Sequence, residues 1–277
     1  TKDYIVNNGI QAMILGIRGG IDSTVVAAIC HEVMVMTGIP LIGRSLPTKY
    51  NRKGETTTAD LVGNAFCTDF KTFNIGNMYE NVLDELIETS EKQTSIANGN
   101  IQARLRMIYL YNLASIHKGL VMDTDNLTEN NLGYFTIHGD VGDFNPIGGL
   151  WKTEVFELAE WISKAYWKEN MEWLQEENFN KDDPRNTKGS QAIAISKSLA
   201  LKPTAGLGIT DNDLEELGAE SYDQVDRVLQ CLTDSSISTD TIDDIPDTVL
   251  ENIVKRHTAS KFKRKRLPIK IDRIWLQ

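Results

Sequence analysis

The sequence predicts an α/β fold, a parallel sheet with helices on both faces, followed by a mainly helical second half. Three observations predict it. Short apolar runs alternate with longer segments of helical period through the first half. Turn-like segments with glycine, proline or aspartate follow the apolar runs, and beyond residue 150 the helical period dominates. Such alternation is typical of parallel sheets, whose ligands bind beyond the carboxyl ends of the strands.

The first strand and the first helix flank a glycine turn. Residues 12–17 are short and apolar, which predicts a buried strand, and residues 23–36 have helical spacing. Gly19 and Gly20 permit a tight turn on which a ligand can approach bare backbone. Asp22 and Ser23 stand where a helix is capped. A strand, a glycine turn and a helix N-terminus together favour an anion site.

The remaining elements continue the alternation. We expect further strands at residues 39–46, 69–75 and 119–124. We expect further helices at residues 55–66, 78–89, 100–117 and 153–167. Residues 178–190 and 203–213 are predicted to be mobile lid loops that are protease-sensitive without ligand, and a helix follows the second.

Composition excludes several classes of protein. The chain has 277 residues, of which 41% are hydrophobic and 25% charged, as in soluble globular proteins. No apolar run is long enough to cross a membrane, and no signal peptide is visible, although the sequence starts at Thr1. Three scattered cysteines argue against disulfides and structural zinc and favour the cytoplasm. The net charge of −10 disfavours nucleic acid, so an anionic ligand requires a local positive pocket.

The glycine turn resembles the pyrophosphate loop S-G-G-x-D-S of the ATP pyrophosphatases, because Gly19, Gly20, Asp22 and Ser23 match it. Arg18 stands in place of the first serine. Four further segments, spread over nearly the whole chain, resemble the ammonia-dependent NAD synthetases of that group. They are "NGNIQARLRMIYLYNLA", "TDNLTENNLGYFT", "GDVGDFNPIGGLWKTEV", and "KPTAGL" with the terminal "FKRKRLP".

The resemblance implies a Rossmann-like fold of the adenine nucleotide alpha-hydrolase type, in one domain over residues 1–277. Residues 1–150 would form the nucleotide-binding core, and residues 151–277 the helical completion with lid loops. The implied activity is amidation of deamido-NAD to NAD with ATP, Mg²⁺ and ammonia, through an adenylate. Because the chain leaves no room for a glutaminase domain, free ammonia is the expected nitrogen source. The family is homodimeric, and we expect the same of this chain.

The resemblance also implies roles for individual residues. The implied ATP-binding residues are Gly19, Gly20, Asp22, Ser23, Thr124, Lys152 and Thr204. The implied substrate-binding residues are Arg104, Asp143 and Lys263. Asp22 and Glu129 would bind Mg²⁺, and Asp22 and Lys152 would be catalytic. These residue types suit the chemistry, since Mg²⁺ prefers oxygen ligands and a leaving pyrophosphate needs cations and N–H donors.

Each candidate has a structural alternative. Arg104 and Arg106 suit a solvated helix face, Asp22 and Glu129 suit helix caps, and Lys152 suits pairing with Glu154 or Glu157. The terminal "KFKRKR" suits a localisation signal or a nucleic-acid patch. If every structural alternative held, the five matching segments would have to occur by coincidence in the same order as in the family. We therefore prefer the resemblance.

Departures from the family pattern leave three alternative functions. Arg18, Asp123 and Ile137 differ from the usual residues, residues 140–143 form a shortened segment and residues 166–201 a lengthened one. One alternative amidates nicotinate mononucleotide or another carboxylate. A second is a nucleotide-binding relative whose catalysis Arg18 impairs. A tRNA-modifying ATP pyrophosphatase is disfavoured by the acidic charge and the absent cysteine pair.

Overall fold

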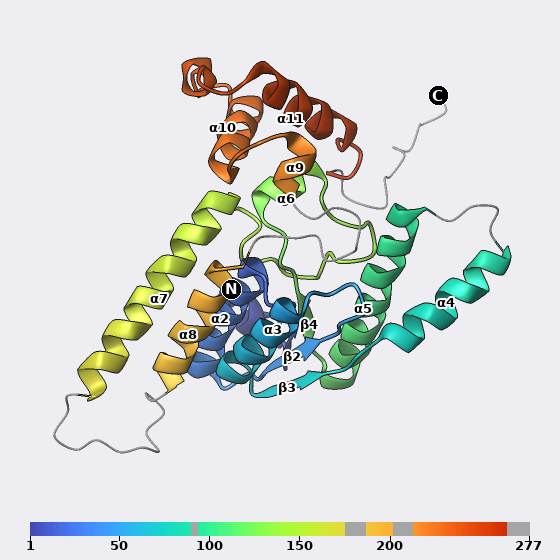
Figure 1. The fold of residues 1–277 in the computed structure, drawn as a ribbon. Coiled ribbons are helices and arrows are strands. Elements are labelled where there is room, and N and C mark those ends of the chain that lie inside the picture. Colours follow the sequence, from blue (N-terminus) through green and yellow to red (C-terminus); the bar gives the residue numbers. More distant parts are fainter. Residues whose placement is uncertain (90–93, 175–186, 202–212, 265–277) are drawn as a thin grey trace, which may run out of the picture.

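The centre of the molecule is a four-stranded parallel sheet (Figure 1). The computed structural model describes residues 1–89, 94–174, 187–201 and 213–264. The strands are β1 (Met13–Gly16), β2 (Leu41–Ser45), β3 (Asp69–Thr72) and β4 (Leu120–Met122), in the order β3-β2-β1-β4. Met13 lies opposite Leu41 on one side and Leu120 on the other. The strand order reverses between β1 and β4, which is where open α/β sheets bind ligands.

Helices surround the sheet and make up most of the second half. They are α1 (Lys2–Asn7), α2 (Ile21–Thr37), α3 (Lys53–Phe66), α4 (Gly76–Thr89), α5 (Ser95–His117), α6 (Leu127–Leu132), α7 (Lys152–Leu174), α8 (Thr187–Leu199), α9 (Asp213–Leu217), α10 (Tyr222–Thr233) and α11 (Asp247–Ala259), with a 3₁₀ turn η2 (Thr239–Ile242). Among the described residues, no helix is both long and apolar enough to cross a bilayer. The predicted α/β fold with a parallel sheet is confirmed.

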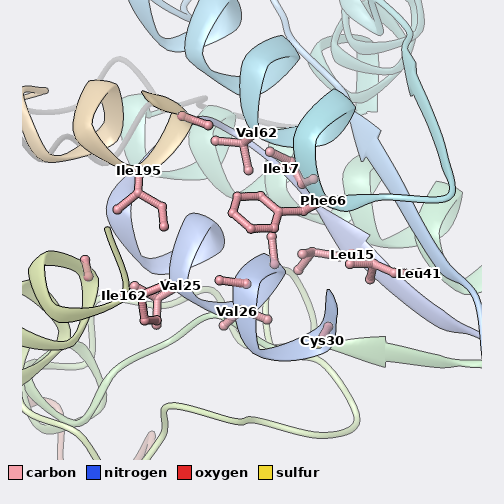
Figure 2. Close-up of a cluster of buried hydrophobic side chains, with 14 of the residues drawn as sticks. Leu15, Ile17, Val25, Val26, Cys30, Leu41, Val62, Phe66, Ile162 and Ile195 are labelled. Carbon is pink, nitrogen blue, oxygen red and sulfur yellow. The ribbon is translucent and has the colours of Figure 1, made fainter. Parts of the chain in front are cut away.

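Alternate residues of β1 face two separate cores, which is the pattern of a strand covered on both sides. Met13, Leu15 and Ile17 pack with α2, α3, α7 and α8, in the cluster that Figure 2 shows in part. Ala12 and Ile14 pack on the other face, with side chains of α4 and α5. Burial of each of the larger side chains, Met, Leu or Ile, contributes about 1.5–3 kcal/mol. The prediction of helices on both faces is therefore confirmed.

A third apolar core lies beside the carboxyl ends of the strands and, among the described residues, contains none from the sheet. We call it the helical cluster; its buried members are Leu132, Leu217, Val225, Val228, Leu229, Ile245, Val249 and Ile253. They come from α6, α9, α10 and α11 and the turn after η2, at the top of Figure 1. The cluster packs against the start of α7 through α6 and α10.

Several predicted boundaries differ from the structure. Helix α5 begins five residues before the predicted start, because the hydroxyl of Thr94 caps it by accepting from the N–H of Ala97. The predicted loop over 178–190 is wrong for its last four residues, which start α8; the buried face of α8, at Ala192 and Ile195, joins the first core. Residues 178–186 and 203–212 lie outside the described residues, so the predicted lids stay predictions. The division of the chain at residue 150 also stays a prediction.

Candidate active site

The glycine turn joins β1 to α2 at the carboxyl edge of the sheet. Gly19 has φ +90°, and a Cβ there would come within 2.4 Å of the carbonyl oxygen of Glu55, so only glycine fits. Gly20 is exposed and forms the N-cap of α2. The first turn of a helix leaves N–H groups without partners in the helix, and these attract anions. The turn can therefore accept a phosphate group against exposed backbone.

The predicted capping by Asp22 and Ser23 is wrong. Gly20 is the N-cap of α2 and, as a glycine, offers no side-chain acceptor to the first turn of the helix. The hydroxyl of Ser23 donates to the carbonyl oxygen of Gly20 at 3.1 Å, and that of Ser198 on α8 donates to the carbonyl oxygen of Gly19 at 2.5 Å. Hydroxyl groups therefore fix the carbonyl side of the turn.

Lys152 joins the two predicted metal ligands. Its Nζ lies 2.5 Å from Oδ2 of Asp22 and 3.3 Å from Oε1 of Glu129, and the side chain is 2% exposed. Asn126 Nδ2 donates to Oδ1 of Asp22 at 2.9 Å. Burial lowers the pKa of Lys152, but the charges of Asp22 and Glu129 outweigh it and hold the pKa above its ordinary value. The site therefore contains a protonated amine between two carboxylates.

These contacts decide between the alternatives for Lys152 and Glu129. Lys152 pairs with Asp22 and Glu129 rather than with Glu154, whose carboxylate accepts from the N–H of Trp151 instead. Glu129 is a helix cap as well, because Oε2 accepts from the N–H of Asn126 while Oε1 faces Lys152. One carboxylate oxygen of Glu129 therefore caps the helix, while the other binds Lys152 in the site.

The same carboxylates suit a magnesium ion that is shared with a nucleotide. Within the described part of the chain, no three histidine, cysteine, aspartate or glutamate side chains are placed to hold a metal. Mg²⁺ bound with a nucleotide needs only one or two protein carboxylates, since phosphate oxygens and water complete its shell. Asp22 and Glu129 could supply these two carboxylates, and both already face the ammonium group of Lys152.

A pocket that is partly open to solvent lies beside the glycine turn at the carboxyl ends of β1, β2 and β4. It is lined by Gly16, Ile17, Arg18, Arg44, Leu46, Ala103, Arg106, Met107, Leu110, Val121, Met122, Thr124, Gly139 and Asp140. Apolar walls and arginine side chains together suit a nucleotide. The local positive charge expected of an acidic chain with an anionic ligand is supplied here by arginine.

Arg106 is a buried member of this pocket. Its Nε donates to the carbonyl oxygen of Leu46 at 3.1 Å and its Nη2 to Oδ1 of Asn51 at 3.3 Å. Burial and the charge of Arg18 lower the pKa of Arg106 to about 9. The alternative of a solvated helix face is therefore wrong for Arg106, although Arg104, two residues earlier, is exposed.

Asp140 lies in the same pocket and is the acidic counterpart of its arginines. Burial raises the pKa of Asp140 to about 6, against the N–H of Thr136 and the charge of Arg18, which both lower it. The N–H of Thr136 donates to Oδ1 of Asp140 at 2.6 Å. Arg18 therefore acts electrostatically on an acid and on Arg106 at once.

The predicted substrate-binding residues contact protein groups other than those of the Lys152 site. Arg104 donates to the carbonyl oxygen of Ile137 at 3.3 Å. Asp143 accepts from the hydroxyl of Tyr111 and from the N–H of Val121, both at 3.0 Å, beside the edge strand β4. Lys263 donates to the carbonyl oxygens of Gly133 and Phe135, at 2.7 and 2.5 Å. None of the three lines the pocket, and Thr204 lies outside the described residues.

The structure adds residues that the sequence did not reveal. They are Arg44 and Ser198, Asn126, and two residues of α10, Tyr222 and Asp226. Asp226 is 1% exposed among the apolar side chains of the helical cluster. No local signal in the sequence marks this acid, because its burial depends on partners that lie far along the chain.

Comparison with known proteins finds relatives along the chain. A family described as NAD synthase matches residues 1–267. The chain is 33% identical over 239 residues to the NH(3)-dependent NAD(+) synthetase of Methanococcoides burtonii, covering 83% of this chain and 78% of that protein. The Campylobacter jejuni (strain 81116) protein of the same name is 30% identical over 259 residues, covering 93% and 90%. Among solved structures, NMN synthetase from Francisella tularensis superposes with a TM-score of 0.74 at 27% identity, covering 98% and 93%.

Proposed function

Because the chain belongs to the NAD synthase family, we propose that it is a ligase that amidates deamido-NAD with ammonia at the expense of ATP. The carboxylate of deamido-NAD attacks the α-phosphorus of ATP, and the bond between the α-phosphorus and the bridging oxygen breaks, releasing pyrophosphate. Ammonia then attacks the carbonyl carbon of the adenylate. AMP leaves, the nitrogen loses a proton, and NAD remains.

One observation carries this proposal: a protonated lysine lies between two carboxylates, beside the start of the helix that follows the glycine turn. The turn and the N-terminus of α2 suit the pyrophosphate, which gains charge as it leaves. Lys152 suits the same developing charge from a site that is almost closed to water. Mg²⁺, when bound to Asp22 and Glu129, supplies further positive charge to the phosphate oxygens.

The pocket supports a place for the rest of ATP. Its apolar residues, among them Met107 and Leu110, suit the adenine ring, while Thr124 offers a hydroxyl. We propose that Gly19, Gly20 and Ser23 complete the phosphate site from the turn. Thr204 is proposed for ATP from the resemblance alone.

The substrate side of the site rests on the same resemblance. We propose that Arg104, Asp143 and Lys263 contact the dinucleotide. Each now binds protein groups, so each would exchange a hydrogen bond for the ligand. Replacing Arg104 by Ala should raise KM for deamido-NAD with little change of kcat, which steady-state kinetics can measure.

The experiment that tests the function uses the purified chain with ATP, Mg²⁺, ammonium and deamido-NAD. We expect NAD, AMP and pyrophosphate in equal amounts, and no AMP when deamido-NAD is left out. Formation of ADP instead of AMP, or ATP cleavage without NAD, would overturn the proposal. Glutamine in place of ammonium should give no NAD, since relatives covering most of this chain are named NH(3)-dependent.

A second candidate substrate is nicotinate mononucleotide. It is favoured by the likeness to NMN synthetase from Francisella tularensis, which covers 98% of this chain. Relative kcat/KM values for the mononucleotide and the dinucleotide decide between the two. We propose the dinucleotide, because the curated relatives that cover most of the chain bear the name NAD synthetase.

We further propose a cytoplasmic homodimer without nucleic-acid or membrane partners. All three cysteines are free thiols, as suits a reducing compartment. On α5, Ile108 and Ile116 are 64% and 65% exposed, which favours a protein contact on that helix. Sedimentation equilibrium should give twice the chain mass, and replacing Ile108 by Glu should shift it toward the monomer.

A further inference from the structure

Helix α10 contributes a buried carboxylate to the start of α7. Asp226 Oδ2 accepts from the N–H of Thr153 at 2.9 Å and from its hydroxyl at 2.8 Å. Oδ1 accepts from the hydroxyl of Thr128, on α6, at 2.5 Å. Asp226 therefore serves the first turn of α7 as an N-cap supplied by another helix, and its charge complements the positive end of that helix.

The same contacts fix the backbone of Lys152. The N–H of Lys152 donates to Oγ1 of Thr128 at 2.8 Å, and the hydroxyl of Thr128 donates in turn to Asp226. The next N–H in the chain, of Thr153, donates to Asp226 directly. Asp226 thus fixes two consecutive peptide groups, that of Thr153 directly and that of Lys152 through Thr128, and the lysine side chain projects from this point.

A second residue of α10, one helical turn before Asp226, bounds the other end of the lysine. The ring centroid of Tyr222 lies 5.6 Å from Nζ of Lys152, within the range of a cation–π contact. Asp22 and Glu129 approach the same ammonium. The ammonium is therefore bounded by two carboxylates and a ring, while Asp226 fixes its stem.

Burying Asp226 has a cost that packing alone would not require. The residue is 1% exposed, between Val225 and Val228 of the helical cluster, where an apolar side chain would suit the core. Its hydrogen bonds to Thr128 and Thr153 offset that cost only while both partners keep their places. Losing either partner would leave part of a buried carboxylate without a hydrogen bond, so the network favours a single geometry.

We propose that Asp226 and Tyr222 are positioning residues that hold the ammonium of Lys152 on the Asp22–Glu129 pair. The role of this lysine in turnover rests on the proposed function, whereas its placement does not. Misplacement of a reacting group by about 1 Å costs on the order of 10²-fold in rate. Asp226 acts on the reaction only through Lys152.

The first test compares D226N with D223N, a matched control on the same helix. Asp223 is exposed and pairs with Arg227 at 2.9 Å, outside the site. In D226N, an NH₂ group replaces one of the two accepting oxygens, so Thr128 or Thr153 loses its acceptor. We expect kcat for AMP formation to fall 10- to 100-fold in D226N, with KM for ATP changed less than threefold, and to change less than twofold in D223N. An unchanged kcat in D226N overturns the proposal.

Two further measurements separate positioning from loss of folding. In a K152M background, D226N should slow the residual reaction less than twofold, because its effect passes through the lysine; full additivity of the two losses overturns the proposal. Thr128→Ser, which keeps the hydroxyl, should retain at least half of kcat, whereas Thr128→Val should resemble D226N. Equal activity of these two variants also overturns it.

The last measurement does not need turnover. A water-soluble N-hydroxysuccinimide ester acylates exposed lysines, and mass spectrometry of peptides reports the rate at Lys152. We expect slow acylation in the parental chain and in D223N, and at least fivefold faster acylation in D226N and Y222L. Equal rates in all four overturn the positioning role. If the parental chain makes no NAD, the proposed function fails while the acylation rates still decide the placement of Lys152.

Discussion

Lys152 is held from two regions that contribute in different ways. The α/β core supplies Asp22, which lies two residues after the glycine turn, so the phosphate-binding backbone and its acid come from one short segment. The helices that form the helical cluster supply Glu129 from α6 and Tyr222 from α10, two single residues on separate helices. The difference shows that the phosphate site is local in sequence, while the position of the cation is a tertiary property.

Removing the ammonium group of Lys152 should have the largest effect on kcat, because it breaks the contacts with both regions at once. In K152M, the ammonium is replaced by an apolar group of similar length, which gives the leaving pyrophosphate no charge. We expect kcat to fall on the order of 10²–10³-fold, the range found when one charge-stabilising donor is removed. Pre-steady-state release of pyrophosphate measures this step. A fall of less than tenfold would show that the lysine is mainly structural.

The two regions can be separated by replacing their carboxylates one at a time. Asp22→Ala and Glu129→Ala should both lower turnover far more than the free energy of unfolding, and raise the Mg²⁺ concentration needed for half-maximal rate. We expect the larger loss at Asp22, whose oxygen lies 2.5 Å from the ammonium, against 3.3 Å for Glu129. Kinetics over a Mg²⁺ titration, with chemical denaturation alongside, checks this. If both variants keep near-parental activity, the metal assignment is wrong.

In the α/β core, Asp140 should make the stability of the folded chain depend on pH. Its pKa in the folded chain is about 6, against 3.8 for an unperturbed aspartate, so the folded state prefers the protonated acid. The stabilisation is present below pH 4 and is lost as pH rises to about 6, a loss of up to about 3 kcal/mol at roughly 1.36 kcal/mol for each pH unit. Asn at this position keeps the acceptor for Thr136 and stays neutral.

D140N should therefore be more stable than the parental chain at pH 8 and equal to it at pH 4. Urea unfolding at both values measures the difference. In the R18S variant, the pKa of Asp140 should rise further, because the charge of Arg18 lowers it in the parental chain. If the difference in the free energy of unfolding between D140N and the parental chain is the same at pH 4 and at pH 8, the carboxyl group titrates as it does in the unfolded chain.

Arg18 acts within one region, the α/β core, so replacing it should change kcat less than the substitutions at the Lys152 site do. It lines the pocket, and its charge acts on Arg106 and Asp140. A guanidinium strengthens phosphate binding, but it is larger than serine at a turn where backbone must come close. We expect R18S to raise kcat several-fold and to weaken ATP binding, as kinetics and calorimetry can measure. Loss of activity would make Arg18 a working part of the site.

Much of the α/β core could be predicted from the sequence, since its strands are short apolar runs that end at glycine or polar turns. The helical elements were less visible. Helix α6 has six residues and is stabilised by a capping box between Asn126 and Glu129 rather than by an apolar stripe. Helix α8 begins in a polar segment, and its apolar buried side chains come only after position 191, where the helix packs against α7, α3 and α2.

The site divides in the same way. Gly19, Asp22 and Lys152 belong to segments with recognisable local patterns, and the structure brings Asp22 and Lys152 into contact. Asp226 could not be predicted by pattern alone, because its partner Thr153 lies 73 positions away and its helix reads as an ordinary amphipathic one. Arg44 was missed for a similar reason: it lies in an apolar strand, and its partner Asp69 comes 25 residues later.

The bond between Asp22 and Lys152 spans 130 residues of chain. Contacts of such large sequence separation close a long loop, whose entropy must be overcome before the contact stabilises anything. During synthesis, the glycine turn emerges long before the lysine does. A growing or partly folded chain can therefore form the phosphate-binding turn without the cation that completes it. The two halves of this centre therefore meet only after residue 152 has been synthesised.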